Sequence, residues 1–117
     1  MKTSELTGAA LDWAVAKCEG IELENGCYNR LLVDGRMSKG QSMLVPFKPS
    51  ADWQQGGAII ERERIELEHD GFQWWARIWA DADFNGTTPL IAAMRCYVAS
   101  KMGDDVEVPE ELQGETA

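Results

Sequence analysis

The side chains of this sequence that could carry out catalysis do not have the spacing of a catalytic site. The single histidine, His69, stands beside a predicted turn, where a structural role is the usual one. The three cysteines lack the short paired spacing of a zinc site. Glu61 and Glu63 alternate with arginines, a pattern more typical of a solvated, self-neutralising surface than of paired catalytic carboxylates. The sequence therefore predicts a protein that is not an enzyme and that uses no metal or cofactor.

Tryptophan and arginine are the residues that favour a binding function. The chain has five tryptophans in 117 residues, more than a small domain needs for its core. Both residue types anchor protein interfaces and stack on planar groups. The candidate binding residues come from three predicted elements and are Asp52, Trp53, Gly56, Gly57, Glu61, Arg62, Trp75, Arg77, Trp79 and Arg95.

Some of the tryptophans are expected to be buried in the core, and others could equally lie at the surface. We expect Trp13 and Trp74 to be core residues. Core and surface positions are about equally expected for Trp53, Trp75 and Trp79. A residue of this second group is a binding candidate if the fold leaves it accessible.

The roles of the glycine and arginine candidates depend on which groups pack against them. Gly57, which has no side chain, would allow a neighbour or a ligand to approach the backbone. The pair Gly56-Gly57 lacks the third glycine and the lysine of a phosphate-binding loop. Arg95 lies in an otherwise apolar helix, so its side chain either extends to solvent or pairs with a buried carboxylate such as Asp52 or Glu61. We favour the buried pair.

Local signals mark the first and last helices. Residues 7–18 carry apolar side chains at helical spacing, with Thr7 as the N-cap and Gly20 at the end. The last helix begins at Thr88-Pro89, where a capping hydroxyl precedes a proline in the first helical position. Gly103 ends it.

The middle of the chain predicts a second helix and two short strands. Ser50 is the expected cap of a helix that is weakened at Gly56-Gly57 and continues to about residue 62. Residues 28–33 are expected to form a strand that ends before a turn at Asp34-Gly35. After a loop over residues 36–42, a second strand covers residues 43–47.

A β-hairpin is predicted around Asp70-Gly71, because alternating apolar and polar residues stand on both sides of this turn signal. With a two-residue turn, the facing pairs are His69 with Phe72, Leu67 with Trp74, and Ile65 with Ala76. The opposite face would carry Glu66, Glu68, Gln73, Trp75 and Arg77, with Trp79 just beyond. Either helices cover both faces of the sheet, or this second face meets a partner.

These elements predict an α+β fold, a small α/β sandwich in which a short antiparallel sheet packs against two to three helices. We expect one domain over residues 1–103 and an acidic tail over residues 104–117. Six of the twenty acidic residues and no lysine or arginine follow Lys101. Val106, Val108 and Leu112 are able to hold part of this tail against the domain.

Net charge and hydropathy narrow the class of partner. A formal net charge of −9 argues against nucleic acid as a partner, because clustered basic residues are needed to displace counterions from phosphates. The sequence shows no signal peptide and no apolar run long enough to span a bilayer. We therefore expect a cytoplasmic protein that does not act at a membrane.

The sequence from residue 49 to residue 63, PSADWQQGGAIIERE, resembles a signature segment of the NinX-like proteins of lambdoid phages. Residues 6–16, 88–101 and 103–109 are also similar to segments of this family. Two positions depart from its pattern, Ala51 in place of threonine and Ala58 in place of proline. The resemblance implies a phage accessory protein with an α/β sandwich fold that acts in the cytoplasm of an infected bacterium, and it implies no particular biochemical activity.

Taken together, the sequence predicts a non-enzymatic phage accessory protein that binds a host or phage protein. The alternative is a pocket lined by Trp53, the glycine pair and arginines, which would capture a nucleotide-like small molecule, such as a signalling compound of host defence. A homodimer formed through the tryptophan-bearing face of the hairpin is also compatible with the sequence.

Overall fold

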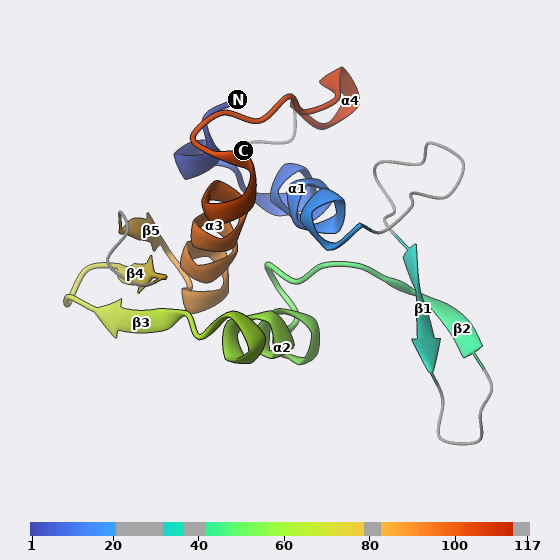
Figure 1. The fold of residues 1–117 in the computed structure, drawn as a ribbon, viewed down its shortest axis with the longest axis horizontal. Helices are drawn as coiled ribbons and strands as arrows, with labels where there is room; N and C mark the ends of the chain where they lie inside the picture. Colours follow the sequence, from blue (N-terminus) through green and yellow to red (C-terminus); the bar gives the residue numbers. More distant parts are fainter. Residues whose placement is uncertain (21–31, 37–41, 79–82, 114–117) are drawn as a thin grey trace.

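The computed structural model describes residues 1–20, 32–36, 42–78 and 83–113. Figure 1 shows helices and a three-stranded sheet forming the body of the protein, with a two-stranded hairpin beside them. The elements in chain order are η1 (Thr3–Glu5), α1 (Gly8–Glu19), β1 (Leu32–Arg36), β2 (Ser42–Pro46), α2 (Trp53–Glu63), β3 (Glu66–His69), β4 (Trp74–Arg77), β5 (Phe84–Gly86), α3 (Pro89–Met102) and α4 (Glu110–Gln113).

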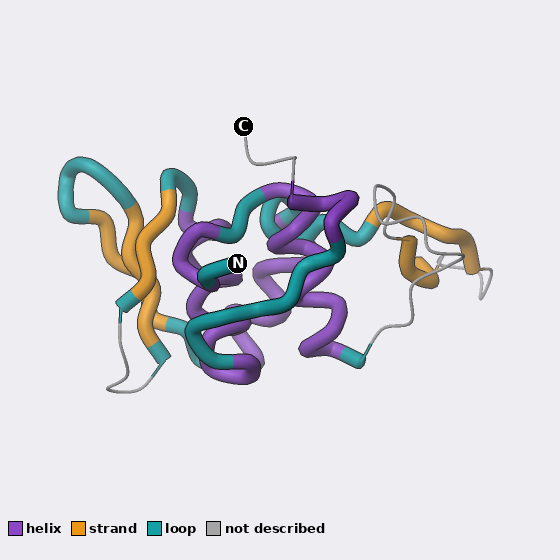
Figure 2. The backbone as a smooth tube through the Cα atoms, turned by 90° about the horizontal axis from the view of Figure 1, so that it is seen from above, coloured by secondary structure: helices purple, strands orange, loops and turns teal. Residues whose placement is uncertain are grey.

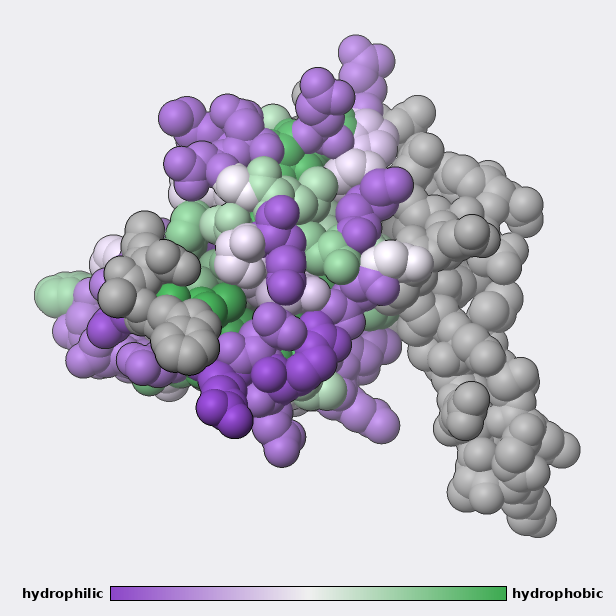
Figure 3. Space-filling model, in the orientation of Figure 1, coloured by the Kyte–Doolittle hydropathy of each residue, from purple (hydrophilic) through white to green (hydrophobic). Residues whose placement is uncertain are grey.

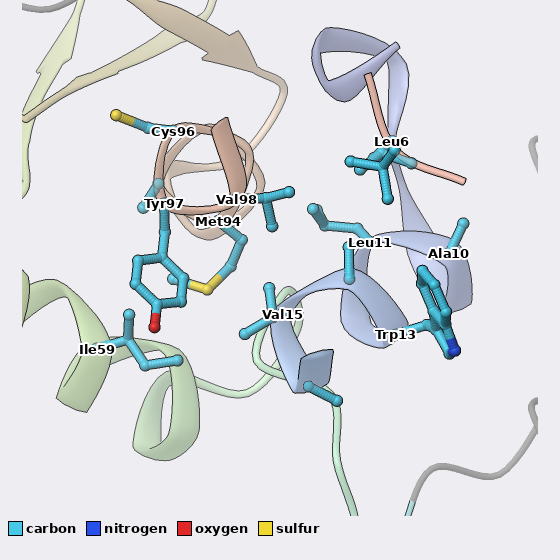
Figure 4. Packing of buried hydrophobic residues seen from close by; sticks show 14 of the residues in the cluster. Leu6, Ala10, Leu11, Trp13, Val15, Ile59, Met94, Cys96, Tyr97 and Val98 are labelled. Atoms are coloured by element: carbon cyan, nitrogen blue, oxygen red, sulfur yellow. The ribbon is translucent and has the colours of Figure 1, made fainter. Parts of the chain in front are cut away.

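Helix α3 lies at the centre of the fold. Figure 2 shows β3, β4 and β5 as one layer with the helices beside it. One side of α3 packs against this sheet, and other sides pack against α1 and α2. Leu11, Val15 and Met94 meet between α1 and α3 (Figure 4). Trp13 is buried and Trp74 packs against the core, as expected. The predicted α+β fold is confirmed.

The ends of α1 and α3 follow the predicted local signals. Thr7 occupies the N-cap position of α1, and Gly20 ends that helix in the left-handed conformation. The Thr88 hydroxyl accepts a hydrogen bond from the Ile91 N–H at 3.1 Å, with Pro89 in the first turn. Gly103 ends α3. Both helices therefore begin and end where the sequence predicts, within a residue.

Helix α2 differs from the prediction in its cap and in its continuity. The N-cap is Asp52 rather than Ser50, because the Asp52 carboxylate accepts the Gln54 N–H at 2.9 Å. The helix runs without interruption through Gly56-Gly57. A Cβ atom on Gly56 would lie 2.3 Å from the Pro49 carbonyl oxygen and 2.7 Å from Leu90 Cδ2. Close packing against these neighbours offsets the weak helix propensity of glycine.

The β3–β4 hairpin exists, but its predicted register was wrong by two residues. Leu67 pairs with Ala76, and His69 pairs with Trp74. The turn covers residues 70–73 because the Asp70 carboxylate accepts two backbone N–H groups, those of Phe72 and Gln73, at 2.8 and 2.9 Å. A shift of two residues leaves every side chain on its predicted face.

The hairpin of β1 and β2 corrects a second turn prediction. Asp34 and Gly35 lie inside β1, paired with Leu44 and Met43 of β2, so the turn predicted there was wrong. Pairing with the neighbouring strand outweighs the local turn preference of Asp-Gly. The strand predicted over residues 43–47 is confirmed. Residues 28–31 and 37–41, like Trp79, lie outside the described residues.

Part of the chain after α3 packs back onto the body. Val106, Val108 and Leu112 are buried in the core, in agreement with the expectation from the sequence. The backbone of this segment also pairs with the start of the chain, since the Val106 N–H bonds to the Met1 carbonyl at 2.8 Å and the Thr3 N–H bonds to the Asp104 carbonyl at 2.8 Å.

A buried carboxylate joins α1 to the segment before α2. Asp12 is 6% exposed and accepts the Ser50 N–H at 2.9 Å. Burial raises the pKa of Asp12 from 3.8 to about 6, while the hydrogen bonds from Ser50 and the charge of Lys48 oppose this rise. The folded protein therefore holds a proton on Asp12 over a pH range in which the unfolded chain releases it.

Gly56 and its neighbour Gly57 provide a matched test of the close packing of α2 against Pro49. We expect Gly56→Ala to lower the free energy of unfolding by about 2 kcal/mol, because its Cβ would collide with the Pro49 carbonyl. Gly57→Ala meets Trp53 Cε3 at an ordinary 3.5 Å and should raise stability by up to about 1 kcal/mol. Urea denaturation measures both values. Equal effects of the two substitutions would refute the close approach at Gly56.

The pKa of Asp12 predicts a pH dependence of stability. Because its pKa is higher in the folded protein than in the unfolded chain, its contribution to the free energy of unfolding falls as pH rises from about 4 to about 6 and is constant above. Asp12→Asn removes this contribution. Between pH 3 and pH 7 the stability difference should shift in favour of the variant by on the order of 3 kcal/mol. A difference that stays constant with pH would show that Asp12 titrates normally.

Candidate functional site

The sheet presents one side to α3 and the other outward. Trp74 and Ala76 of β4 point toward the core, so the alternation of a strand places Trp75 and Arg77 on the opposite face. Strand β3 adds two glutamates to that face. We call the surface formed by Glu66, Glu68, Trp75 and Arg77 the outer sheet face. It contains an open depression of about 350 Å³, which Leu67 and Ala76 also line.

Carboxylates surround the single arginine of the outer sheet face. The Arg77 Nε donates to Asp83 at 2.8 Å, while its two terminal nitrogens lie 3.9 Å from Glu66 and Glu68. The side chains of Glu66 and Glu68 are 68% and 72% exposed. Figure 3 shows hydrophilic residues gathered over the region of β3, at the lower left of the view. The face is therefore acidic, and Arg77 is held by neighbours within it.

Trp75 has a fixed orientation on this face. Its indole Nε1 donates to the Asp70 carboxylate at 2.7 Å. The same carboxylate accepts the Gln73 and Phe72 N–H groups. Hydrogen bonds from Gln73, Trp75 and Phe72 lower the pKa of Asp70 to about 2, so it is ionised at neutral pH. One carboxylate thus holds both the turn and the tryptophan ring.

The turn carries an exposed aromatic residue that is not among the candidates predicted from the sequence. Phe72 is 94% exposed, although Asp70 fixes its backbone. Gly71 precedes it with φ +98°, a conformation that favours glycine. The two-residue turn predicted from the sequence paired Phe72 with His69 and therefore placed Phe72 within a strand. An aromatic residue directly after Asp-Gly was the one available signal.

Arg62 lies in an ion-pair network that joins three helices. Its terminal nitrogens donate to the two Glu19 carboxylate oxygens at 2.9 and 2.7 Å, and its Nε donates to Glu63 at 2.8 Å. The Tyr97 hydroxyl donates a short hydrogen bond to Glu19. The bond from Arg62 is the main cause that lowers the pKa of Glu19, and burial is the main cause that raises the pKa of Tyr97. This network fastens α1, α2 and α3 to one another.

Arg95 has partners other than those predicted. Its Nε donates to the Leu6 carbonyl at 2.7 Å, and a terminal nitrogen donates to the Asn85 carbonyl at 2.8 Å. The expected pairing with Asp52 or Glu61 was therefore wrong. These carbonyls precede α1 and lie in β5, on either side of α3, where the guanidinium fork reaches both. Burial lowers the pKa of Arg95.

The remaining candidates lie along α2. Trp53 is 55% exposed in the first turn, and Gly57 and Glu61 follow it at helical spacing on the same face. Gly56 faces Pro49 and Leu90, on the buried side of the helix. The structure thus brings Trp75 and Arg77 together on the sheet, places Trp53 on a separate helix, and bonds Arg62 and Arg95 to different internal partners.

Two properties of the described residues bear on the class of protein. Among them, no group of three histidine, cysteine, aspartate or glutamate side chains is arranged to hold a metal ion. Within the described ranges, no helix is both long and apolar enough to cross a membrane.

The fold and the site together define a small α+β domain with one sheet face packed on a helix and an acidic, aromatic face turned outward. The family model described as Bacteriophage P22, NinX matches residues 2–101, and the chain belongs to this family. No curated protein matches the chain. The matched range includes α1, α2, the whole β3–β5 sheet and α3 up to residue 101, and the resemblance noted in the sequence is confirmed.

The dual role of Asp70 predicts a local effect of its removal. In Asp70→Ala the Trp75 indole N–H should move upfield in nitrogen–proton correlation spectra, and the Phe72 and Gln73 amides should exchange faster with solvent, because all three lose the same acceptor. Asp83→Ala, which removes the contact to Arg77, serves as the control and should leave the Trp75 signal in place. An unchanged indole signal in Asp70→Ala would contradict the assigned hydrogen bond.

Proposed function

We propose that this phage protein acts by binding another protein, of the host or of the phage, through the outer sheet face and Phe72. The action would take place in the cytoplasm of an infected bacterium and would involve no catalysis. Membership of the phage family supports the setting of this proposal. The binding role rests on the surface itself.

One observation carries the proposal: an aromatic side chain that is 94% exposed on an ordered turn. Exposed aromatic surface is costly in water, and aromatic residues are enriched at the centres of protein interfaces. Because Asp70 already fixes the turn, binding through Phe72 would lose little backbone entropy. The same carboxylate holds the Trp75 indole, so the Phe72 backbone and the Trp75 ring are both in place before a partner binds.

Three titratable groups near this surface, His69, Asp70 and Asp83, have structural partners, which supports a role without catalysis. The His69 Nδ1 accepts the Gly71 N–H at 3.2 Å, and its ring contacts Trp74 edge-on at 5.0 Å between centroids. Asp70 holds the turn, and Asp83 holds Arg77. A general base needs a lone pair directed at a substrate, and these groups direct theirs at the protein.

The alternative, a nucleotide-like ligand, has weaker support in the geometry. Arg62 and Arg95 are the arginines that would bind its phosphates, but their guanidinium groups donate to Glu19 and to backbone carbonyls. The depression on the sheet is lined by glutamates, which repel phosphate groups. Binding of a nucleotide-like ligand can be distinguished from binding of a protein by experiment.

The test compares aromatic substitutions on two surfaces. Tagged protein is expressed in an enterobacterial host during infection, a co-purifying protein is identified, and its binding to purified variants is measured by calorimetry. We expect Phe72→Ala and Trp75→Ala to weaken binding at least about tenfold, as interface anchors do. Trp53→Ala removes an exposed tryptophan from α2 and should bind normally.

Two results would contradict the proposal. Loss of binding in Trp53→Ala with normal binding in the sheet variants would place the site on α2. A rise in melting temperature with nucleotides, together with no protein partner, would favour the small-molecule alternative.

A further inference from the structure

We propose that the outer sheet face receives a basic segment of the partner protein, with an arginine side chain of that segment stacked on Trp75 and paired with Glu68. This inference rests on the proposed protein-binding function and adds the chemistry of the partner. Four observations support it: the orientation of Trp75, the position of Glu68, the length of the contacts to Arg77, and the charge of the face.

Trp75 and Glu68 form the two halves of a guanidinium site. They are directly paired across β3 and β4, so their side chains leave the sheet next to each other. The indole ring is held by its bond to Asp70 and lines the depression of about 350 Å³. A guanidinium group is planar, stacks on an indole face and donates two parallel hydrogen bonds to a carboxylate.

The glutamates keep their capacity to bind a cation. Arg77 makes its close contact with Asp83, at 2.8 Å, whereas Glu66 and Glu68 lie 3.9 Å from it. At 3.9 Å a charge pair is beyond hydrogen-bond length, so the oxygen lone pairs of both glutamates remain available. Arg77 therefore leaves both carboxylates able to accept hydrogen bonds from a partner.

The charge of the surface selects the partner. Three carboxylates, those of Glu66, Glu68 and Asp83, lie within 4 Å of one guanidinium, that of Arg77. A fourth, that of Asp70, is bonded to Trp75. A second copy of this chain, which has a net charge of −9, would bring like charges together on the same face. Anionic lipid and nucleic acid are disfavoured for the same reason. A basic protein segment is the complementary occupant.

A pair of peptides tests this inference on the full-length protein. The probe is acetyl-Gly-Arg-Val-Arg-Gly-amide, and the control replaces both arginines by citrulline, which keeps the shape and removes the charge. We expect the arginine peptide to shift the Trp75 indole signal and the amides of β3 in nitrogen–proton correlation spectra, with an effect that weakens as salt is added. The citrulline peptide should shift neither.

Two double glutamate variants test whether the peptide binds at the outer sheet face. The double substitution Glu66→Gln and Glu68→Gln should weaken peptide binding at least about tenfold. Glu5→Gln and Glu107→Gln change the net charge equally at exposed positions elsewhere and should retain binding. Equal shifts with the citrulline peptide, equal loss in both double variants, or no shift of the Trp75 signal at millimolar peptide would each overturn the inference. A dimer that Trp75→Ala dissociates would also overturn it, in favour of a second copy.

The outcomes separate this inference from the proposed function. A protein partner that needs Phe72 and Trp75 but binds the Glu66→Gln, Glu68→Gln variant normally would leave the proposed function intact and reject the basic segment. Peptide binding at Trp75 without any protein partner that needs Phe72 would reject the proposed function and support the chemistry of the face.

Discussion

The structure depends on the burial of α3 on nearly all of its sides. Seven of its residues are buried, and they are spread around the helix: Leu90, Ala92, Ala93, Met94, Cys96, Tyr97 and Val98. A helix that is apolar around its circumference must be surrounded. The sheet covers one side of α3, and α1 and α2 cover others. Covering α3 uses the inner face of the sheet, so the outer sheet face is left to meet something other than this helix.

Because α3 is buried, the polar side chains on it and beside it find partners within the protein. Arg95 lies on α3 between η1 and β5, and its guanidinium bonds to backbone carbonyls on both sides of the helix. On another side of α3, Tyr97 reaches the edge of the core and bonds to Glu19, which pairs with Arg62. Arg95 and Glu19, the two charged groups of this set that are largely buried, thus have partners within the protein, as buried charges require. The arginines available to a partner are therefore fewer than the sequence suggests, and the binding candidates narrow to the sheet and its turn.

What the sequence predicted correctly is local, and what it missed depends on contacts between distant residues. The ends of α1 and α3 follow from caps, a proline and glycines within a few residues. The faces of the hairpin follow from alternation, and they survive an error of two residues in register. The side chain of Asp70 decided the turn and exposed Phe72, and the Asp-Gly pattern does not encode that choice. Arg95 bonds to a carbonyl 89 positions away, for which the sequence carries no signal.

The proposed function requires a protein partner that contacts Phe72 and Trp75. Site-specific photo-crosslinking in infected cells detects such a contact, with benzoylphenylalanine placed at position 72, or at position 53 as the control. We expect position 72 to crosslink to one protein, at an apolar site next to arginines, and position 53 not to crosslink to it. Crosslinking of that protein from position 53 alone, or crosslinking between two copies of this chain at position 72, would contradict it.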